Sequence, residues 1–379
     1  MAASGASDQD RARSQPRIAI VHDYVTQRGG AERVALALLR TFPGSRLVTS
    51  FYEPDTTFDE FRDIEIETLR VNRIGALRKD PRRAVPILAP AFSQHVVQDA
   101  DLLICSSSGW AHGIGGNQPR VVYCYNPARW LYQWEEYRKG AGGLAKLVMP
   151  PLTPSLRGWD ARAAKKANAY VGTSRVVIDR IYGAYGRSAE LVPPPVTLDP
   201  TGPQQPMEHV ESGFLLVVGR GRGYKNVDVI VDAVERLLPD ERLVVVGGAQ
   251  HSETHTDRIT YVGTVSDAEL RWLYSQCRAL VTVAHEDFGL TPLEANLFGR
   301  PAVVVRAGGF LDTVIEGVNG TFCSEATPES FAEAVREMPQ FDPRAVKNHV
   351  NSFSTIDFSS KIQEIVKGVW SKHQNRASG

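Results

Sequence analysis

The sequence predicts an α/β protein built from two doubly wound parallel-sheet domains. Short runs of apolar, largely β-branched residues alternate with segments of helical spacing, and the runs are apolar throughout, as in strands that are buried on both faces. The alternation occurs twice, before and after a proline-rich segment. The length of 379 residues also exceeds what one hydrophobic core usually supports.

The first half begins with a predicted strand at 17–24 and a helix at 31–42. Its other predicted strands are 47–52, 101–105, 120–125, 169–173 and 190–195. The predicted strands of the second half are 214–219, 243–247, 259–263, 279–284 and 301–305. The predicted helices of the second half are 227–238, 267–277, 291–298 and 328–337, and a detached last helix covers 358–370.

The boundary between the halves is marked by composition. Three prolines at 193–195 end the first half, and the polar, turn-rich segment after them has no period. We therefore expect a disordered tail at 1–16, an N-terminal domain at 17–196, a linker at 197–213, a C-terminal domain at 214–355 and a C-terminal segment at 356–379.

Overall composition excludes several classes of protein. The chain carries 43 basic and 43 acidic side chains, which argues against a uniformly basic nucleic-acid binder. No apolar run approaches the roughly 20 residues of a membrane span, and the N-terminus lacks the apolar core of a secretory signal. The four cysteines form no CxxC pair, so we expect buried thiols in a reducing cytoplasm.

The first candidate motif is Gly29-Gly30-Ala31-Glu32, between the first predicted strand and its helix. Ligands of open parallel sheets bind beyond the carboxyl ends of the strands, where glycine lets the backbone approach and a helix N-terminus attracts phosphate. An ordinary turn that needs glycine for its backbone geometry is the alternative. The motif makes Gly30 a candidate for contact with an anion.

A glycine- and arginine-rich loop follows the first strand of the second half. It reads GRGRGYKN from Gly219 to Asn226, and it is neither a Walker loop nor a GxGxxG fingerprint. Arg220 and Lys225 lie beside the strand end, where two cations can neutralise a diphosphate and stabilise it as a leaving group. A solvated basic turn is the alternative.

The third motif, EDFGLTPLE, carries two carboxylates. Glu286 follows a predicted strand, and Glu294 lies in the next helix. The amides of Phe288, Gly289 and Leu290 at that helix N-terminus could bind an anion, while the carboxylates could accept hydrogen bonds from sugar hydroxyls. One alternative is that the two carboxylates are a glycosidase-like acid/base pair. The other is a purely structural role, in which Glu286 caps the helix and Glu294 forms an ion pair on its surface.

These motifs together resemble retaining glycosyltransferase family 4. The stretch that begins EDFGLTPLE resembles the family's Glu-x7-Glu signature, and Gly219–Asn226 resembles its G-R-x-x-x-x-K-N/G element. Segments 243–248 and 259–270 are similar to its nucleotide-binding middle, and Gly29–Glu32 is similar to its first glycine loop. YCYNPARW, at 123–130, resembles the YCHTPxRY segment of mannosyltransferase-like members.

The resemblance covers about residues 17–370 and implies a GT-B fold, in which two Rossmann-like domains face each other across a cleft. The nucleotide-sugar donor would bind to the C-terminal domain and the acceptor to the N-terminal one, with the last helix crossing back. No metal is implied. The catalytic residues implied are Arg220, Lys225 and Glu286, and the donor-binding residues are Gly30, Gly219, Arg220, Lys225, Asn226, Gly263, Glu286, Phe288, Gly289, Leu290 and Glu294.

The chain departs from this family where a histidine is often found near the reacting carbon. Tyr125 stands at the histidine position of the YCHTP segment. His112 is therefore the nearest candidate catalytic histidine, although a loop histidine is the alternative. His22, at the end of the first strand, is a weaker candidate.

Charge is divided between the halves. Residues 1–196 hold 26 basic and 19 acidic side chains, and the remainder has the opposite imbalance. One basic stretch has apolar neighbours such as Ile74 and Ile87, which suggests peripheral docking on an anionic membrane surface that carries the acceptor. Its members are Arg70, Arg73, Arg78, Lys79, Arg82 and Arg83, with Asp80 as the one acid among them. A solvated face is the alternative.

We therefore expect a hexosyltransferase that uses GDP-mannose and a glycolipid or lipid-linked acceptor, as in phosphatidylinositol mannoside or polysaccharide assembly. It would lie in the cytoplasm, peripheral on the inner face of the cell membrane, without nucleic-acid partners. A UDP-sugar transferase with a soluble acceptor and a non-catalytic nucleotide-sugar-binding protein are the alternatives.

Overall fold

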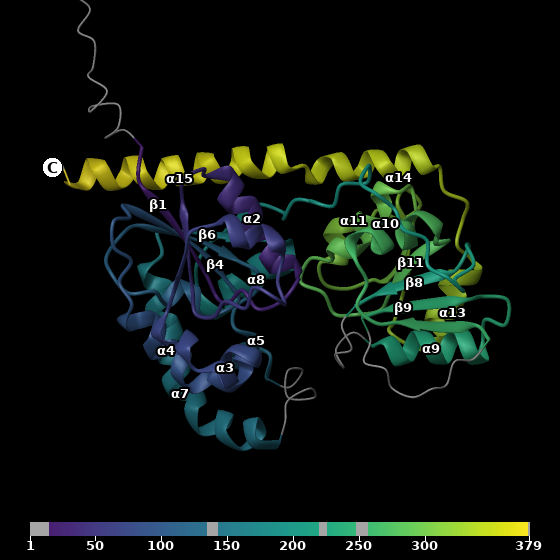
Figure 1. Ribbon diagram of the computed structural model, residues 1–379, viewed down its shortest axis with the longest axis horizontal. Helices are drawn as coiled ribbons and strands as arrows, with labels where there is room; N and C mark the ends of the chain where they lie inside the picture. Colours follow the sequence, from purple (N-terminus) through teal and green to yellow (C-terminus); the bar gives the residue numbers. More distant parts are fainter. Residues whose placement is uncertain (1–14, 135–142, 220–225, 248–256, 378–379) are drawn as a thin grey trace, which may run out of the picture.

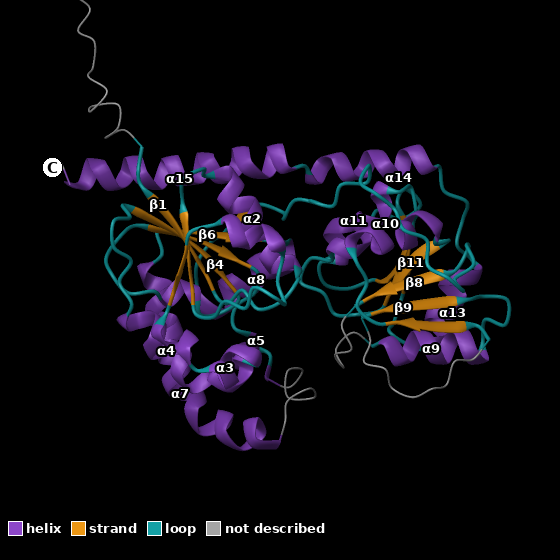
Figure 2. Cartoon of the chain, viewed as in Figure 1, coloured by secondary structure: helices purple, strands orange, loops and turns teal. Residues whose placement is uncertain are grey.

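The computed structural model describes residues 15–134, 143–219, 226–247 and 257–377 (Figure 1). They form two parallel sheets, one of seven strands in the order β3-β2-β1-β4-β5-β6-β7 and one of six in the order β10-β9-β8-β11-β12-β13. Helices cover both sheets (Figure 2). The fold class predicted from strand–helix alternation is therefore confirmed. The disordered tail predicted at 1–16 falls, up to residue 14, outside the described residues.

The first domain has a central strand, β1, flanked by β2 and β4. Its strands are β1 Ile18–His22, β2 Arg46–Thr49, β3 Ile66–Thr68, β4 Leu102–Ser107, β5 Arg120–Cys124, β6 Ala169–Gly172 and β7 Glu190–Leu191. Its α-helices are α2 Gly30–Thr41, α3 Gly75–Lys79, α4 Val85–Gln94, α5 Arg129–Tyr132, α7 Gly143–Lys166 and α8 Arg175–Tyr185. Short 3₁₀ helices are η1 Asp59–Asp63, η2 Arg70–Arg73, η3 Pro81–Ala84 and η4 Ala111–Gly113.

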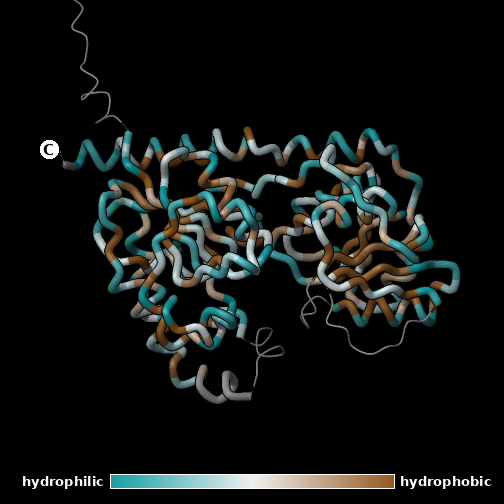
Figure 3. Tube along the Cα trace, in the orientation of Figure 1, coloured by the Kyte–Doolittle hydropathy of each residue, from teal (hydrophilic) through white to brown (hydrophobic). Residues whose placement is uncertain are grey.

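The second domain repeats this arrangement around β8 and β11. Its strands are β8 Leu215–Val218, β9 Leu243–Val246, β10 Ile259–Val262, β11 Ala279–Thr282, β12 Ala302–Val305 and β13 Gly320–Cys323. Its helices are α9 Val227–Arg236, α10 Asp267–Gln276, α11 Leu290–Leu297, α12 Phe310–Thr313, α13 Pro328–Arg336 and α14 Pro343–Val350. Apolar strands run through the middle of each domain, and polar residues gather outside (Figure 3). The buried residues form two large clusters in the first domain and one in the second.

The predicted elements differ from the observed ones where proline intervenes. The strand predicted at 190–195 ends after Leu191, because the prolines that follow have no N–H to donate to a ladder. Helix α7 was not predicted, since Pro150, Pro151 and Pro154 lie inside it and normally indicate a break. Strands β3 and β13 were also missed; they are only 3 and 4 residues long.

The chain passes between the domains twice. The N–H of Val196 donates to the carbonyl of Phe353 at 3.0 Å, so the two passages lie side by side. After the 3₁₀ helix η7 (Asn351–Phe353), α15 (Thr355–Ala377) runs along the first domain (Figure 1). Its apolar face, which includes Phe358 and Ile362, joins one core cluster of that domain. The last helix therefore ties the end of the chain to its beginning.

The segment 197–213 has no helix or strand, and it is docked on the second domain. Arg271 of α10 donates to the carbonyls of Asp199 and Pro203, and Met207 packs against the core of that domain. In the part of the chain that the structure describes, no helix is both long and apolar enough to cross a membrane.

Candidate active site

The glycine loop of the first domain approaches the second domain. Gly29 is the N-cap of α2 in extended geometry, and no described side chain caps this helix, so its first amides are open to a ligand. A Cβ on Gly30 would lie 3.2 Å from Cδ1 of Leu290, the first residue of α11. The missing side chain therefore lets the two domains meet closely here.

The loop that carries Glu286 is fixed by close backbone packing. The N–H of Gly309 donates to the carbonyl of Glu286 at 2.9 Å, and a Cβ on Gly309 would lie 2.3 Å from Cα of Phe288. Gly289 has a φ of 90°, and its Cβ would lie 2.5 Å from the ring of Phe310. Because neither glycine has room for a side chain, this packing holds the backbone from Glu286 to Gly289 in place.

Glu294 is a buried and oriented carboxylate. It is 8% exposed, and its Oε2 accepts a 2.7 Å hydrogen bond from the hydroxyl of Tyr274. Burial, and then the nearby charge of Glu294, raise the pKa of Tyr274 well above its usual value. The hydroxyl therefore stays protonated and holds the carboxylate in one orientation.

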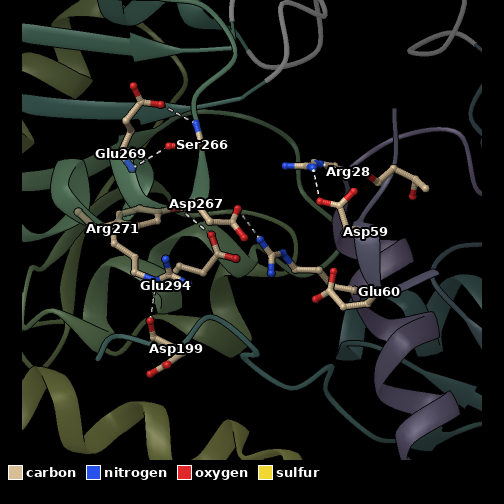
Figure 4. Close-up of polar contacts among 12 residues, drawn as sticks. Arg28, Asp59, Glu60, Asp199, Ser266, Asp267, Glu269, Arg271 and Glu294 are labelled. Carbon is tan, nitrogen blue, oxygen red and sulfur yellow. Dashed lines mark hydrogen bonds and ion pairs between the residues drawn. The ribbon is translucent and has the colours of Figure 1, made fainter. Parts of the chain in front are cut away.

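Figure 4 shows polar residues of the two domains near Glu294. Asp267, at the start of α10, lies with Glu294 on the second-domain side, and Arg28 and Asp59 lie on the first-domain side. Arg33 of α2 reaches the second domain, with its Nη2 3.7 Å from Oδ1 of Asp267. The first helix of the N-terminal domain thus contacts the region around Glu294.

The glycine- and arginine-rich loop is anchored at the same edge. Arg220 and Lys225, the two predicted catalytic cations, lie outside the described residues. Gly219 follows β8 directly, and Asn226 is the N-cap of α9. The side-chain amide of Asn226 donates to a backbone carbonyl just after β11 at 3.1 Å. Both ends of the loop therefore lie beside the strand that leads to Glu286.

Most of the predicted donor-binding residues lie at the facing carboxyl ends of the two sheets. The group comprises Gly30, Gly219, Asn226, Gly263, Glu286, Phe288, Gly289, Leu290 and Glu294. Gly263 directly follows β10, with open space where a side chain would be. Among the described residues, no group of three His, Cys, Asp or Glu side chains is placed to hold a metal ion. Metal-free transfer stays a prediction.

His112 lies inside the first domain. Its side chain is 3% exposed, its Nε2 is 3.0 Å from Oδ1 of Asp160, and its Nδ1 is 3.3 Å from Oγ of Ser107. Its ring also lies against Trp159 of α7. Because the ring is buried and its nitrogens face Asp160 and Ser107 inside the domain, this geometry favours a structural role over the predicted catalytic one.

Tyr125, which replaces the histidine of the resembling segment, ends a buried hydrogen-bond chain. Its hydroxyl donates to the carbonyl of Ala31 at 2.9 Å and lies 2.7 Å from Oγ of Ser106. Nδ1 of His22 is 2.9 Å from the same Oγ. Since Tyr125 has one proton and a carbonyl only accepts, Ser106 donates to Tyr125, and neutral His22 donates to Ser106. These hydrogen bonds link the ends of β1, β4 and β5 to the first turn of α2.

The protonation of His22 leads to a pH prediction. Burial lowers its pKa to about 4, against the opposing effect of the Ser106 hydrogen bond. In the unfolded chain the pKa of a histidine is about 6.5, so between this value and the native pKa the unfolded chain binds a proton that the native protein does not. Stability therefore falls as the pH decreases from about 6.5 toward the native pKa. Between pH 7 and pH 5, the free energy of unfolding of the native protein should fall by about 2 kcal/mol more than that of His22→Asn, as measured by urea unfolding. Parallel pH profiles would contradict this assignment.

The basic stretch is partly neutralised. Arg78 is half-buried, and its Nε donates to Glu53 at 2.8 Å, so Asp80 is not the only acid that opposes this stretch. Arg83 lies 3.3 Å from Asp80, and the side chain of Arg82 lies outside the described residues. Exposed cations remain on η2, at the end of α3 and on η3: Arg70, Arg73, Lys79 and Arg83. Ile74 and Ile87 are exposed among them, at 47% and 36%.

Sequence reasoning missed the residues that join the domains. Asp287, next to Glu286, binds Arg129 and Arg180 of the first domain. Arg175, at the start of α8, also pairs with Asp312 of α12 at 3.0 Å. Arg129 and Asp287 both lie inside motifs that the sequence singled out, but nothing in either motif indicates the other as its partner.

Comparison with known proteins finds a family match in the second half of the chain. Residues 202–345 match the family model described as Glycosyl transferases group 1. The matched residues make up most of the second domain. The D-inositol 3-phosphate glycosyltransferase of Xylanimonas cellulosilytica is 29% identical over 195 residues, which is 44% of this chain and 47% of that protein. The alpha-1,3/1,6-mannosyltransferase ALG2 of Dictyostelium discoideum is 31% identical over 119 residues, 29% of this chain and 28% of that protein.

These alignments span about half or less of the length of the curated relatives. Solved structures match nearly the whole of this chain. HepE of Anabaena, crystallised in complex with UDP-glucose, has a TM-score of 0.69 at 17% identity, and the match covers 93% of this chain and all of that one. The similarity of the two folds confirms the predicted GT-B architecture.

Proposed function

We propose that the protein is a retaining glycosyltransferase that binds a nucleotide sugar on its second domain and transfers the hexose to an acceptor on its first. One observation carries the proposal. Two carboxylates of one segment, Glu286 and Glu294, lie at the carboxyl edge of the second sheet, and the start of the same helix lies against Gly30 of the first. The match of residues 202–345 to the family model and the GT-B fold support it.

The chemistry follows from the charges around this segment. The bond between the sugar carbon and the diphosphate oxygen breaks as the acceptor oxygen bonds to the same face of that carbon. The departing oxygen takes the acceptor's proton, while Arg220 and Lys225 stabilise the diphosphate. The open amides at the start of α11 add positive potential, Glu286 orients the sugar, and Glu294 binds the ribose. Attack on the face that the leaving group occupied retains configuration.

For the donor we propose GDP-mannose. The resemblance of residues 123–130 to mannosyltransferase-like members supports it, as does the mannosyltransferase among the relatives. A UDP-sugar is the second candidate, because a protein of similar fold was crystallised with UDP-glucose.

Thermal unfolding with free nucleotides tests the donor class. A ligand at 100 times its Kd that binds only the folded protein stabilises it by about 2.7 kcal/mol. We expect GDP to raise the Tm by several degrees, with smaller shifts from UDP, ADP and NAD. A shift with UDP alone would move the donor to the alternative class, and no shift with any nucleotide would contradict the donor site. Nucleotide binding without sugar transfer would support the non-catalytic alternative.

For the acceptor we propose a glycolipid or lipid-linked sugar on an anionic membrane surface. The exposed cations Arg70, Arg73, Lys79 and Arg83, with Ile74 and Ile87 between them, support a docking face. Docking here would place the first domain against the inner face of the cell membrane, where such acceptors are assembled.

Vesicle sedimentation tests the docking face. Each basic side chain near an anionic surface contributes about 1 kcal/mol, so Arg70→Glu with Arg73→Glu should lower binding to phosphatidylserine vesicles by at least about 30-fold at low salt. Lys361→Glu with Lys367→Glu, on the exposed face of α15, makes the same change in charge and should bind as the native protein does. Equal losses in both pairs, or no preference for anionic vesicles, would contradict the docking face.

A further inference from the structure

Asp287 lies in the loop at 286–289, called the donor loop here because Glu286, Phe288 and Gly289 are predicted to bind the donor. Its side chain binds the first domain. It directly follows Glu286 and precedes Phe288, yet its carboxylate is paired with two arginines of the first domain. Oδ2 accepts from Nε of Arg129 at 3.1 Å and lies 2.5 Å from its Nη2, and Oδ1 accepts from Nη1 of Arg180 at 2.5 Å. Both oxygens are therefore engaged across the domain boundary.

The surroundings strengthen this contact. The side chain of Asp287 is 19% exposed, and those of Arg129 and Arg180 are 31% and 30% exposed. Ion pairs that are shielded from water to this extent are stronger than fully exposed surface ion pairs. The hydroxyl of Ser174 also donates to the backbone carbonyl of Asp287 at 2.5 Å. Backbone and side chain of the same residue are thus held by the first domain.

The segment that follows β5 helps to position both arginines. Arg129 is the first residue of α5, and Nη1 of Arg180 lies 3.4 Å from Oδ1 of Asn126. Tyr125, in the same segment, donates to the carbonyl of Ala31 beside the glycine loop. One stretch of the first domain therefore contacts both the glycine loop and the donor loop.

We propose that Asp287 is a positioning residue for sugar transfer: by binding Arg129 and Arg180, it closes the two domains over the donor and fixes the backbone that carries Glu286. This inference rests on the proposed glycosyltransferase activity. Nucleotide alone binds through the second domain, so it does not need this contact. Transfer needs the sugar, Glu286 and the acceptor in one geometry, and a shift of about 1 Å in such a site costs up to about 100-fold in rate.

Kinetics and binding of Asp287→Asn test the proposal. We expect kcat to fall by about 10- to 100-fold, while the Kd for the free nucleoside diphosphate stays within about twofold. Arg180→Met should also lower kcat, and the double variant should be no worse than Asp287→Asn alone, because the two residues act through one contact. Arg175→Gln is the control, because it removes another ion pair between the domains, in which the arginine side chain is 78% exposed. This variant should retain the native kcat.

Small-angle X-ray scattering gives a readout that does not depend on activity. Asp287→Asn should have a larger radius of gyration than the native protein and Arg175→Gln. A native kcat and a native radius of gyration in Asp287→Asn would overturn the proposal. An equal loss of nucleotide affinity and kcat would also overturn it, since that indicates damage to the second domain alone. If the native protein transfers no sugar, the proposed function fails, and the scattering comparison still decides whether Asp287 closes the domains.

Discussion

Replacing Glu286 with glutamine is expected to lower sugar transfer by at least about 100-fold, the loss typical of removing one group that stabilises a transition state. The backbone of Glu286 is held by Gly309, so we expect its carboxylate to reach the donor sugar from a fixed part of the chain. Glutamine keeps the shape and loses the charge. Lys225→Ala should have a loss of similar size, because the departing diphosphate would lack a cation.

Steady-state kinetics with the preferred donor would measure both variants, and circular dichroism would check that they remain folded. Glu364→Gln provides a matched control, since it makes the same change on the exposed face of α15. Near-normal turnover in both Glu286→Gln and Lys225→Ala would refute the site assignment. A loss of similar size in Glu364→Gln would show that the effect is not specific to the site.

Gly309→Ala is expected to damage both stability and transfer. Its Cβ would lie 2.3 Å from Cα of Phe288 and 2.4 Å from the carbonyl oxygen of Asp287, and backbone atoms cannot rotate away as a side chain can. The donor loop must therefore move. Overpacking of this kind costs about 1–3 kcal/mol, and the displaced loop should lower kcat by about tenfold or more.

The matched control is Gly183→Ala, in α8, where an added Cβ meets nothing within 4 Å. Alanine there should be neutral or stabilise the protein by up to about 1 kcal/mol, because alanine favours a helix interior over glycine. Urea unfolding and initial rates of both variants would test the pair. Equal stability and equal rates in Gly309→Ala and Gly183→Ala would show that the donor loop is not held by the turn at Gly309.

The clustering of most predicted donor-binding residues at one edge of each sheet could be predicted from sequence for a geometric reason. The carboxyl ends of parallel strands lie at one edge of a sheet, so motifs that follow successive strands come together without any knowledge of long-range contacts. Gly219, Gly263 and Glu286 each follow a strand of the second sheet and lie at its carboxyl edge.

Contacts between the domains could not be reached in this way. Arg129 and Asp287 are 158 residues apart, and neither is unusual in its own local pattern. His112 was a candidate because it is the nearest histidine to the place where the resembling family often has one, and only the structure brings Asp160 of α7 to its ring. Helix α7 was itself hidden by its prolines, so the partner of His112 could not be anticipated.

The division of charge also has a second explanation. The first half of the chain is basic and the second acidic, which at first suggested only a docking surface. Each ion pair described between the two domains joins an arginine of the first to an aspartate of the second. The pairs are Arg33–Asp267, Arg129–Asp287, Arg180–Asp287 and Arg175–Asp312. Part of the opposite charge therefore serves the contact between the domains, and the stretch on η2, α3 and η3 is left for an external surface.

The central claim is the transfer of a hexose from a nucleotide sugar with retention of configuration. A panel of radiolabelled GDP- and UDP-sugars, incubated with the purified protein and a membrane extract as acceptor source, tests it most directly. The account predicts that GDP-mannose labels a lipid-extractable product whose new linkage keeps the donor's anomeric configuration, and that Glu286→Gln gives no such product. The account would be contradicted if no donor in the panel gave more product than Glu286→Gln, or if the linkage were inverted.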